Sequence, residues 1–296
     1  MKSRLLTLLF LIVACKGTES VAPISGGGGP VPLMGHVIVV VEENTDYSSV
    51  IGSSSMPYLN GLAQQYALAT QYYAVTHPSI GNYFMMTVGK IITNDDSYST
   101  VVSDDNIVRH LLAAGKTWKS YAEDLPSVGY TGGDVGNYAR KHNVIALLSD
   151  VVNSATQRNN LVPFSQFAAD LAGGNLPAYS FVVPNLCNDA HDCSLSTADQ
   201  WLQTNIDPLV KNAAFQRDGL LVIVFDEAGS DNTDGGGHVP CVIVSPKAKR
   251  GYQGTGVYQH QSLLRLTGEA LGLRTLPNAA ATAPDMGEFF QTTGTP

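Results

Sequence analysis

Short runs of apolar, mostly β-branched residues recur along the chain and predict buried strands. The runs span residues 36–41, 179–183, 220–225 and 239–244. Nearly every position in them is apolar, as in parallel strands that helices cover on both faces. Helical periodicity alternates with these runs, at residues 56–66, 107–114, 164–172, 197–212 and 259–271. This alternation favours an α/β sandwich with a mostly parallel central sheet.

The main body of the chain shows no internal repeat and no second linker. We therefore interpret residues 33–296 as one domain, which is long enough to bury a sizeable core. Residues 93–151 have weak periodicity, and we interpret them as an insertion over the functional site.

The first residues have the pattern of a secretion signal. Lys2 and Arg4 precede an apolar run at residues 5–13, which is too short to span a bilayer. A small residue and Cys15 follow, in the form of a bacterial lipobox, where the cysteine is lipidated. The alternative is an ordinary signal peptide in which Cys15 is incidental.

The lipobox interpretation predicts a signal peptide at residues 1–14 and a lipidated flexible tether at residues 15–32, which is rich in glycine and proline. The protein would then be an exported lipoprotein of a bacterial cell envelope, in the periplasm or on the cell surface. Its contact with the membrane would be the lipid anchor only.

The charge of the chain limits its partners. The formal net charge is −8, and such an acidic surface does not attract nucleic acid or anionic lipid. A phosphate-bearing substrate would need a local cation. No cluster of lysines and arginines in the sequence supplies one, which points to a metal ion.

The cysteines fit an oxidising compartment. Cys187 and Cys193 enclose five residues, so a small disulfide loop is expected. A zinc site that adds His191 is the alternative, but it lacks paired C-x-x-C spacing. Cys241 lies in an apolar run and is expected to be a buried free thiol.

Polar residues follow three of the predicted strands. They are Glu42, Glu43 and Asn44 after the first, Asn185, Asn188, Asp189, His191 and Asp192 after the second, and Asp226 and Glu227 after the third. Ligands of open α/β sheets bind beyond the carboxyl ends of strands. Neighbouring carboxylates repel one another unless a cation neutralises them. Oxygen ligands suit Mg, Ca or Mn, and added histidines suit Zn or Fe; the alternative is a set of solvated loops.

Ser79 lies at the predicted start of a further helix, because Pro78 precedes it and residues 80–88 have helical character. Free amides and the helix dipole favour an anion at such a position. An N-cap serine is the alternative. His238 follows three glycines and His260 precedes a predicted helix, so each is either directed at a ligand or an ordinary loop or helix residue.

The ordered set of motifs resembles a known family. The set is Glu43-Asn44, His77-Pro78-Ser79-x-x-Asn82-Tyr83, Pro184-Asn185-x-x-Asn188-Asp189-x-His191-Asp192, Asp226-Glu227 and Gly237-His238. It resembles the bacterial and fungal acid phosphatase and phospholipase C phosphoesterase family, within the alkaline phosphatase superfamily. The resemblance runs from about residue 36 to residue 273.

The resemblance implies a three-layer α/β/α sandwich with a divalent metal ion, either Mg, Ca, Mn or Zn, at the strand ends. It implies that Ser79 is the nucleophile, that Asn82 contacts the phosphoryl oxygens and that His142 lies on the substrate side. His191 and His238 would act near the leaving group or bind a second metal. The implied metal ligands are Glu43, Asn44, Ser79, Asp189, Asp226 and Glu227. Gly81 and Val144 stand where the family often has proline.

The implied activity is metal-dependent hydrolysis of phosphate monoesters through a phosphoserine intermediate. The substrate would be a small phosphomonoester, as for an acid phosphatase, or a phosphoinositide such as phosphatidylinositol 3-phosphate. The alternatives are a phospholipase C-type phosphodiesterase, a serine carboxyl-ester hydrolase, and a non-catalytic calcium-binding surface lipoprotein. The residues around Ser79 form only half of a G-x-S-x-G elbow. The oligomeric state is left open.

Overall fold

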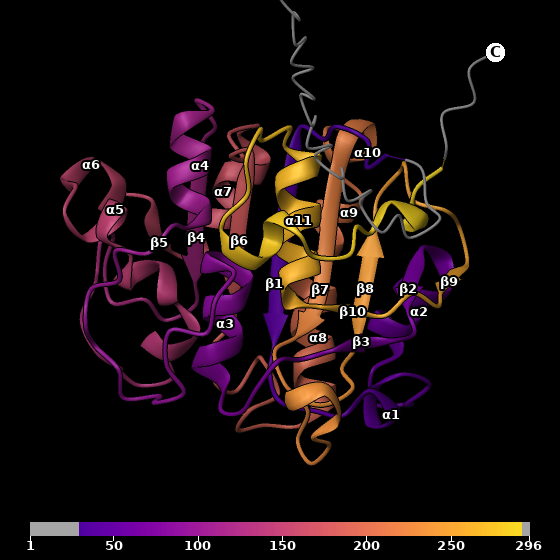
Figure 1. Ribbon diagram of the computed structural model, residues 1–296. Helices are drawn as coiled ribbons and strands as arrows, with labels where there is room; N and C mark the ends of the chain where they lie inside the picture. Colours follow the sequence, from indigo (N-terminus) through magenta and orange to yellow (C-terminus); the bar gives the residue numbers. More distant parts are fainter. Residues whose placement is uncertain (1–29, 292–296) are drawn as a thin grey trace, which may run out of the picture.

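The computed structural model describes residues 30–291 (Figure 1). The predicted signal peptide, Cys15 and most of the predicted tether lie outside the described residues. Within residues 30–291, no helix is long and apolar enough to cross a membrane.

A central sheet of eight strands organises the described part of the chain, in the order β5-β4-β6-β1-β7-β8-β2-β9. Its strands are β1 (His36–Glu42), β2 (Ala67–Ala69), β4 (Trp118–Ala122), β5 (Leu161–Pro163), β6 (Tyr179–Val183), β7 (Gly219–Phe225), β8 (Cys241–Val244) and β9 (Tyr252–Gly254). A small second sheet pairs β3 (Tyr72–Tyr73) with β10 (Tyr258–Gln259). The pairs along β5-β4-β6-β1-β7 are all parallel, which confirms the mostly parallel sheet.

Helices cover both faces of this sheet, so the three-layer α/β/α sandwich is confirmed (Figure 1). The first layer contains α3 (Ser79–Val88), α4 (Ile107–Ala113) and α11 (His260–Ala270). The second contains α2 (Pro57–Gln65), α7 (Ser165–Ala172) and α8 (Leu195–Asn205). The short helices are α1 (Tyr47–Val50), α5 (Ser149–Val152), α6 (Ala155–Arg158), α9 (Asp207–Val210) and α10 (Phe215–Asp218). The 3-10 turns are η1 (Arg140–His142), η2 (Val144–Leu147), η3 (Thr233–Gly235), η4 (Asn278–Ala281) and η5 (Gly287–Phe289).

Neighbouring helices are joined by more than apolar contact. Asp199 on α8 is buried, and its two carboxylate oxygens accept hydrogen bonds from the Tyr58 and Leu59 amides, both at 2.9 Å. These amides belong to the first turn of α2, whose own N-cap residue Met56 offers no side-chain acceptor. Asp199 therefore caps the N-terminus of α2 from a neighbouring helix. Its negative charge also interacts favourably with the dipole of α2.

The last predicted strand differs from expectation in direction. We expected residues 239–244 to be parallel to their neighbours, but β8 runs antiparallel to β7. A parallel return requires a long crossover, whereas residues 226–240 form only a loop with the turn η3. The strand begins after Pro240, because the amide of Val239 bonds to Tyr72 of the small sheet instead.

Two other predictions of local structure were wrong. Residues 93–151 are not an insertion: they contain α4 and β4, and β4 lies inside the sheet between β5 and β6. The predicted helix 197–212 begins at Leu195 and ends at Asn205, and the separate helix α9 follows with Pro208 in its first turn. Proline lacks the amide hydrogen that a continuous helix needs at this point.

Candidate active site

Three parallel strands bring the predicted polar segments together. Strands β6, β1 and β7 are neighbours in the sheet and point the same way, toward the lower edge in Figure 1. Glu43, Asp189 and Asp226 follow their carboxyl ends. The amide of Glu43 donates to the carbonyl oxygen of Asp189 at 2.7 Å, and that of Asp226 to the carbonyl oxygen of Glu42 at 3.0 Å. The loops are thus fixed to one another by backbone hydrogen bonds.

Ser79 is the first residue of α3 and is buried at 1% exposure. Its Oγ lies 3.0 Å from Glu43 Oε2 and 3.1 Å from Glu227 Oε1. The N-cap residue of α3 is Pro78, and the Ser79 hydroxyl is directed at the two carboxylates, so Ser79 is not a capping serine. A hydroxyl has one hydrogen and donates to one of the two oxygens at a time. The other carboxylate oxygen then faces a lone pair of Ser79 Oγ. This contact is repulsive unless a cation lies between them or the carboxylate is protonated.

Asp226, like Glu42 at the end of β1, is a fully buried acid whose carboxylate oxygens have no hydrogen-bond partner. Burial, followed by repulsion from Glu43 and Glu227, raises the pKa of Asp226 well above its usual range. Burial also raises the pKa of Glu43 to about 7, although the neighbouring His142 opposes this change. The site is therefore short of positive charge.

His142 connects two of the strand-end segments. It is buried, with Nε2 at 3.1 Å from Glu43 Oε1 and Nδ1 at 3.4 Å from Asp189 Oδ2. Burial lowers the pKa of His142 to about 4 and raises the pKa of Asp189 to about 7. Tyr83, one turn along α3 from Ser79, stacks on the His142 ring at 5.0 Å and donates its hydroxyl to Glu43 Oε1 at 2.7 Å.

Sequence reasoning did not assign roles to Tyr83 or to His77, although both lie in the motif around Ser79. His77 Nδ1 is 2.6 Å from Glu227 Oε2, and its Nε2 is 3.2 Å from the carbonyl oxygen of Asp231. Asn44 Nδ2 lies 3.5 Å from Glu227 Oε1. The signal that could have identified Tyr83 is the helical spacing of four residues from Ser79, which puts both on one face of α3.

Asn82 supports the segment that precedes Ser79. Its Oδ1 accepts from the amides of Val75 and Thr76, and its Nδ2 donates to the carbonyl oxygen of Thr76. These contacts make Asn82 a positioning residue in this structure. Its contact with phosphoryl oxygens stays a prediction. The second hydrogen of Nδ2 would be available for that contact.

His191 lies at the margin of the site. Its ring centroid is 6.0 Å from that of His142, and its Nδ1 is 2.7 Å from Asp192 Oδ1. The backbone amide of His191 donates to Asp189 Oδ1 at 2.8 Å. His191 is therefore close to the carboxylate cluster and partly open to solvent.

His238 reaches the same edge because β8 is antiparallel and begins there. Its ring stacks on Tyr47 at 4.1 Å and lies 5.0 Å from the Tyr73 ring, and its Nε2 is 3.0 Å from the carbonyl oxygen of Thr70. Among the described residues it has no contact with the carboxylates around Ser79. His260 is fully buried, with Nε2 at 2.6 Å from the carbonyl oxygen of Asp226, and so supports the loop that carries Asp226.

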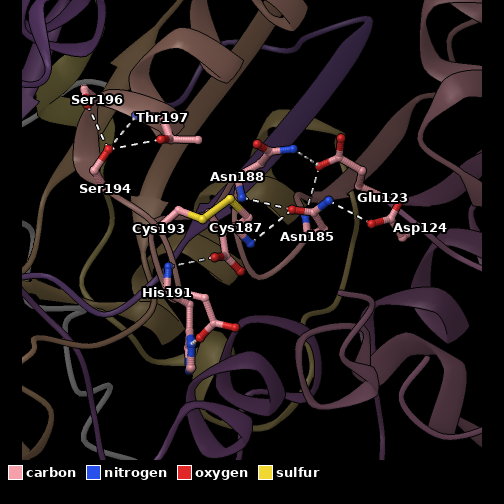
Figure 2. The surroundings of a disulfide bond; sticks show 12 residues. Glu123, Asp124, Asn185, Cys187, Asn188, His191, Cys193, Ser194, Ser196 and Thr197 are labelled. Carbon is pink, nitrogen blue, oxygen red and sulfur yellow. Dashed lines mark hydrogen bonds and ion pairs between the residues drawn. A yellow bond between two sulfur atoms is a disulfide. The ribbon is translucent and has the colours of Figure 1, made fainter. Parts of the chain in front are cut away.

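A disulfide holds the loop after β6, as predicted (Figure 2). Cys187 and Cys193 are joined, while Cys241 is a buried free thiol. Asn185 Oδ1 accepts from the amides of Cys187 and Asn188. Glu123 accepts from the Asn185 amide at 3.0 Å, from Asn188 Nδ2 at 2.9 Å and from Trp201 Nε1 at 3.2 Å. This network fixes the loop that carries Asp189.

The oxygen donors at this site fit a hard divalent cation. Asp226 offers two buried oxygens without partners, and Glu43, Glu227 and Ser79 add oxygen atoms near it, while Asn44 faces Glu227 with its amide nitrogen. Within residues 30–291, however, no group of three or more His, Cys, Asp or Glu side chains converges as in a preformed metal centre. Serine and asparagine would therefore have to complete the ligand set, as the family resemblance implies.

Comparison with known proteins identifies the class of the chain. Residues 53–274 match the model of the Phosphoesterase family. The chain is 32% identical over 283 residues to the phosphatidylinositol-3-phosphatase of Mycobacterium tuberculosis, which covers 92% of this chain and 91% of that protein. It is 32% identical over 250 residues to an acid phosphatase of Aspergillus fumigatus, which covers 79% of this chain and 54% of that protein. The chain thus spans about half the length of this fungal relative.

Solved structures of the alkaline phosphatase superfamily share the fold. A superfamily member from Vibrio parahaemolyticus aligns with a TM-score of 0.54 at 12% identity, over 86% of this chain and 72% of that one. The phosphonate monoester hydrolase of Silicibacter pomeroyi aligns with a TM-score of 0.57 at 13% identity, over 85% of this chain and 75% of that one. The chain belongs to the Phosphoesterase family, and it is a phosphoric ester hydrolase with this fold.

The disulfide yields a direct prediction. Peptide mapping of the purified protein without reduction should recover Cys187 linked to Cys193, because both lie in one short loop on the surface. Cys241 should react with an alkylating agent only after unfolding, because it is fully buried. Recovery of Cys187 and Cys193 as free thiols from the native protein, isolated without reductant, would contradict this pairing.

Proposed function

We propose that this phosphoesterase hydrolyses phosphate monoesters and that Ser79 is its nucleophile. The observation that carries the proposal is the position of the Ser79 hydroxyl. It is buried at the start of α3, within 3.0 Å of Glu43 Oε2 and 3.1 Å of Glu227 Oε1. A hydroxyl becomes a nucleophile when a neighbouring base takes its proton. The dipole of α3 favours the anionic group that the hydroxyl would attack, and the amide of Ile80 in its first turn donates to Asp96.

The proposed reaction needs a cation among the carboxylates. Glu43, Asn44, Asp226 and Glu227 would hold a divalent metal ion next to Ser79, and Asp189 would support it through His142 and the Glu43 amide. Such an ion, when bound, neutralises the phosphoryl oxygens and lowers the pKa of a neighbouring hydroxyl. The metal could be Mg, Ca, Mn or Zn, because the donor set holds carboxylates and nearby histidines.

The residues around Ser79 offer a path for its proton. As Oγ forms a bond to phosphorus, its hydrogen passes to Glu227, whose other carboxylate oxygen is 2.6 Å from His77. The bond to the leaving oxygen breaks, and that oxygen takes a proton from a histidine of the partly open margin, for which His191 is placed best. Water then hydrolyses the phosphoserine and restores the hydroxyl.

The geometry argues against a serine carboxyl-ester hydrolase. That chemistry needs a histidine in hydrogen-bond contact with the nucleophile. Within residues 30–291 the side-chain partners of Ser79 Oγ are Glu43 and Glu227. Carboxylates as neighbours fit a phosphoryl-transfer site with a cation better than a catalytic triad.

The substrate class is inferred from the relatives. The mycobacterial relative is named a phosphatidylinositol-3-phosphatase and matches nearly the whole chain, while the fungal relatives are named acid phosphatases. We therefore favour small phosphomonoesters or phosphoinositides over the diesters of a phospholipase C. Within the described residues the chain has no additional domain beside the sandwich that could bind a lipid surface.

We infer that the protein is exported as a lipoprotein, because the lipobox ends in Cys15 and the body carries a disulfide. Cys15→Ser should move the protein out of the membrane fraction, since buried acyl chains contribute about 0.8 kcal/mol per CH₂. Fractionation followed by immunoblotting measures this. A wild-type protein that is wholly soluble, with its N-terminus beyond Cys15, would contradict lipidation.

Ser79→Ala should abolish hydrolysis of p-nitrophenyl phosphate, because it removes the nucleophile. A loss of at least about a hundredfold in kcat/KM is expected. Ser245→Ala is the matched control, because Ser245 is also buried but its hydroxyl donates to the carbonyl oxygen of Gly219, at the start of β7 and so at the opposite side of the sheet. Near-normal turnover by a folded Ser79→Ala variant would rule out this nucleophile.

Asp226→Asn and Glu43→Gln should each lower metal content and activity together, because each removes a buried negative charge from the proposed ligand set. Elemental analysis of the purified variants measures the metal. Asp170→Asn is the control, since Asp170 is a buried acid paired with Lys119 away from the site. Full metal content in both site variants would show that these carboxylates hold no metal.

A further inference from the structure

The carboxyl ends of the strands carry many carboxylates, yet a phosphate ester is itself an anion. Glu43, Asp189, Asp226 and Glu227 all lie here. The basic residues Lys247, Lys249 and Arg250 follow the end of the antiparallel strand β8, at the opposite side of the sheet, and so do not offset them. The structure nevertheless places Lys141 close to this group, through its ion pair with Asp96.

Lys141 is bound at the start of the helix that carries Ser79. Its Nζ donates to Asp96 Oδ2 at 3.1 Å. The other oxygen of that carboxylate, Oδ1, accepts from the amide of Ile80 at 3.2 Å. Ile80 follows Ser79 directly. The Asp96 carboxylate therefore links the Lys141 ammonium group to the start of α3, where a phosphoryl group would bind.

The next residue in sequence, His142, fixes the backbone beside Lys141. His142 is buried and lies 3.1 Å from Glu43 Oε1. The side chain of Lys141 is itself 17% exposed, so most of its stem is covered. Burial opposes the charged form, but the carboxylates of Glu43 and Asp96 outweigh it and raise the pKa of Lys141.

Gly81 leaves room for the segment that carries Asp96. A Cβ atom at Gly81 would collide with Asn94 Oδ1 and Thr76 Cγ2. Asn94 also donates to Thr76 Oγ1 at 2.8 Å. The segment with Asn94 and Asp96 therefore packs directly against the first turn of α3.

We propose that Lys141 binds the phosphate group of the substrate and that Asp96 positions its ammonium group at the start of α3. This inference rests on the proposed phosphatase function and extends it to a residue with no assigned role. Nζ has three N–H donors, and only Asp96 bonds to it within residues 30–291. Two donors are thus left for phosphate oxygens. An ammonium group is a common phosphate ligand in proteins.

The Lys141–Asp96 ion pair differs from the nearby surface ion pair of Lys90 and Asp104. Lys90 Nζ is 2.8 Å from Asp104 Oδ1, and the two side chains are 56% and 35% exposed. Neither contacts the residues around Ser79 in the described structure. Lys90 is therefore a matched control: it forms the same kind of pair, but outside the site.

The test compares Lys141→Met, Asp96→Asn and Lys90→Met in the full-length, metal-loaded protein with p-nitrophenyl phosphate. Lys141→Met should raise KM about ten- to a hundredfold, the range expected for loss of a charge-assisted hydrogen bond. It should weaken competitive inhibition by inorganic phosphate to a similar extent. Lys141→Arg should recover most of this loss because it restores the charge, and Lys90→Met should change neither constant.

Asp96→Asn separates phosphate binding from a structural role. If the pair only stabilised the loop, Lys141→Met and Asp96→Asn would have equal effects on KM and on the unfolding temperature. We expect KM to change much less in Asp96→Asn, because Nζ remains and the amide oxygen of the new side chain still accepts a hydrogen bond. Equal effects of the two variants, or an unchanged KM and phosphate inhibition in Lys141→Met, would overturn the proposal. Lys141→Gln replaces the Met variant, with the same expectation, if that variant does not fold.

Failure of the proposed function would look different. A wild-type protein that does not hydrolyse the ester, or whose turnover survives Ser79→Ala, would contradict the phosphatase mechanism itself. Titration calorimetry with inorganic phosphate then still tests Lys141 on its own, because binding needs no turnover. Equal phosphate affinity of the wild type and Lys141→Met in that experiment would overturn the role of Lys141.

Discussion

The repulsion among carboxylates buried around one serine hydroxyl is the constraint on which the rest of this structure depends. Two unit negative charges about 4 Å apart repel by about 4 kcal/mol at an effective dielectric constant of about 20. Glu43 and Glu227 both lie within hydrogen-bond distance of Ser79, and Asp226 has two buried oxygens without partners. Such an arrangement is costly unless a cation or protons occupy it. We therefore interpret the cluster as a functional group of residues, because it would be a poor source of stability.

The sheet is what imposes this proximity. Strands β6, β1 and β7 are adjacent, parallel and almost wholly apolar, so their polar extensions have no position except the common edge. Backbone hydrogen bonds join the strand-end loops, and the disulfide with its Glu123 network fixes the loop of Asp189. The rigid scaffold thus holds side chains that would otherwise move apart.

Much of the fold was predictable because buried parallel strands are apolar at every position. The limits of β6 and nearly those of β1 and β7 follow from this pattern. The direction of β8 does not, because an apolar run looks the same in either direction, and only the short loop before it decides. β4 was missed because Lys119 and Ser120 interrupt its apolar pattern, and these polar side chains find partners in Asp170 and Asn143.

The candidate site was predictable in part. Glu43, Ser79, His142, Asp189, Asp226 and Glu227 do lie together. The positions of the strand ends predict that these residues lie close together. They do not predict the direction of each side chain. Asn82 turns to the backbone of Thr76, and His238 lies between two tyrosines. The ion pair of Lys141 was not foreseeable, because Asp96 is 45 positions away in sequence and meets it only where the segment of Asn94 and Asp96 packs against the start of α3.

Removal and return of the metal ion in the wild-type protein tests the central claim most directly. The protein would be stripped with a chelator, checked by elemental analysis and assayed on p-nitrophenyl phosphate as Mg, Ca, Mn or Zn is added back. The account predicts that activity is lost with the metal and returns with at least one of these ions. It also predicts that this ion raises the unfolding temperature, because it binds the folded carboxylate cluster. A metal-free protein that hydrolyses the ester at the full rate would contradict the account.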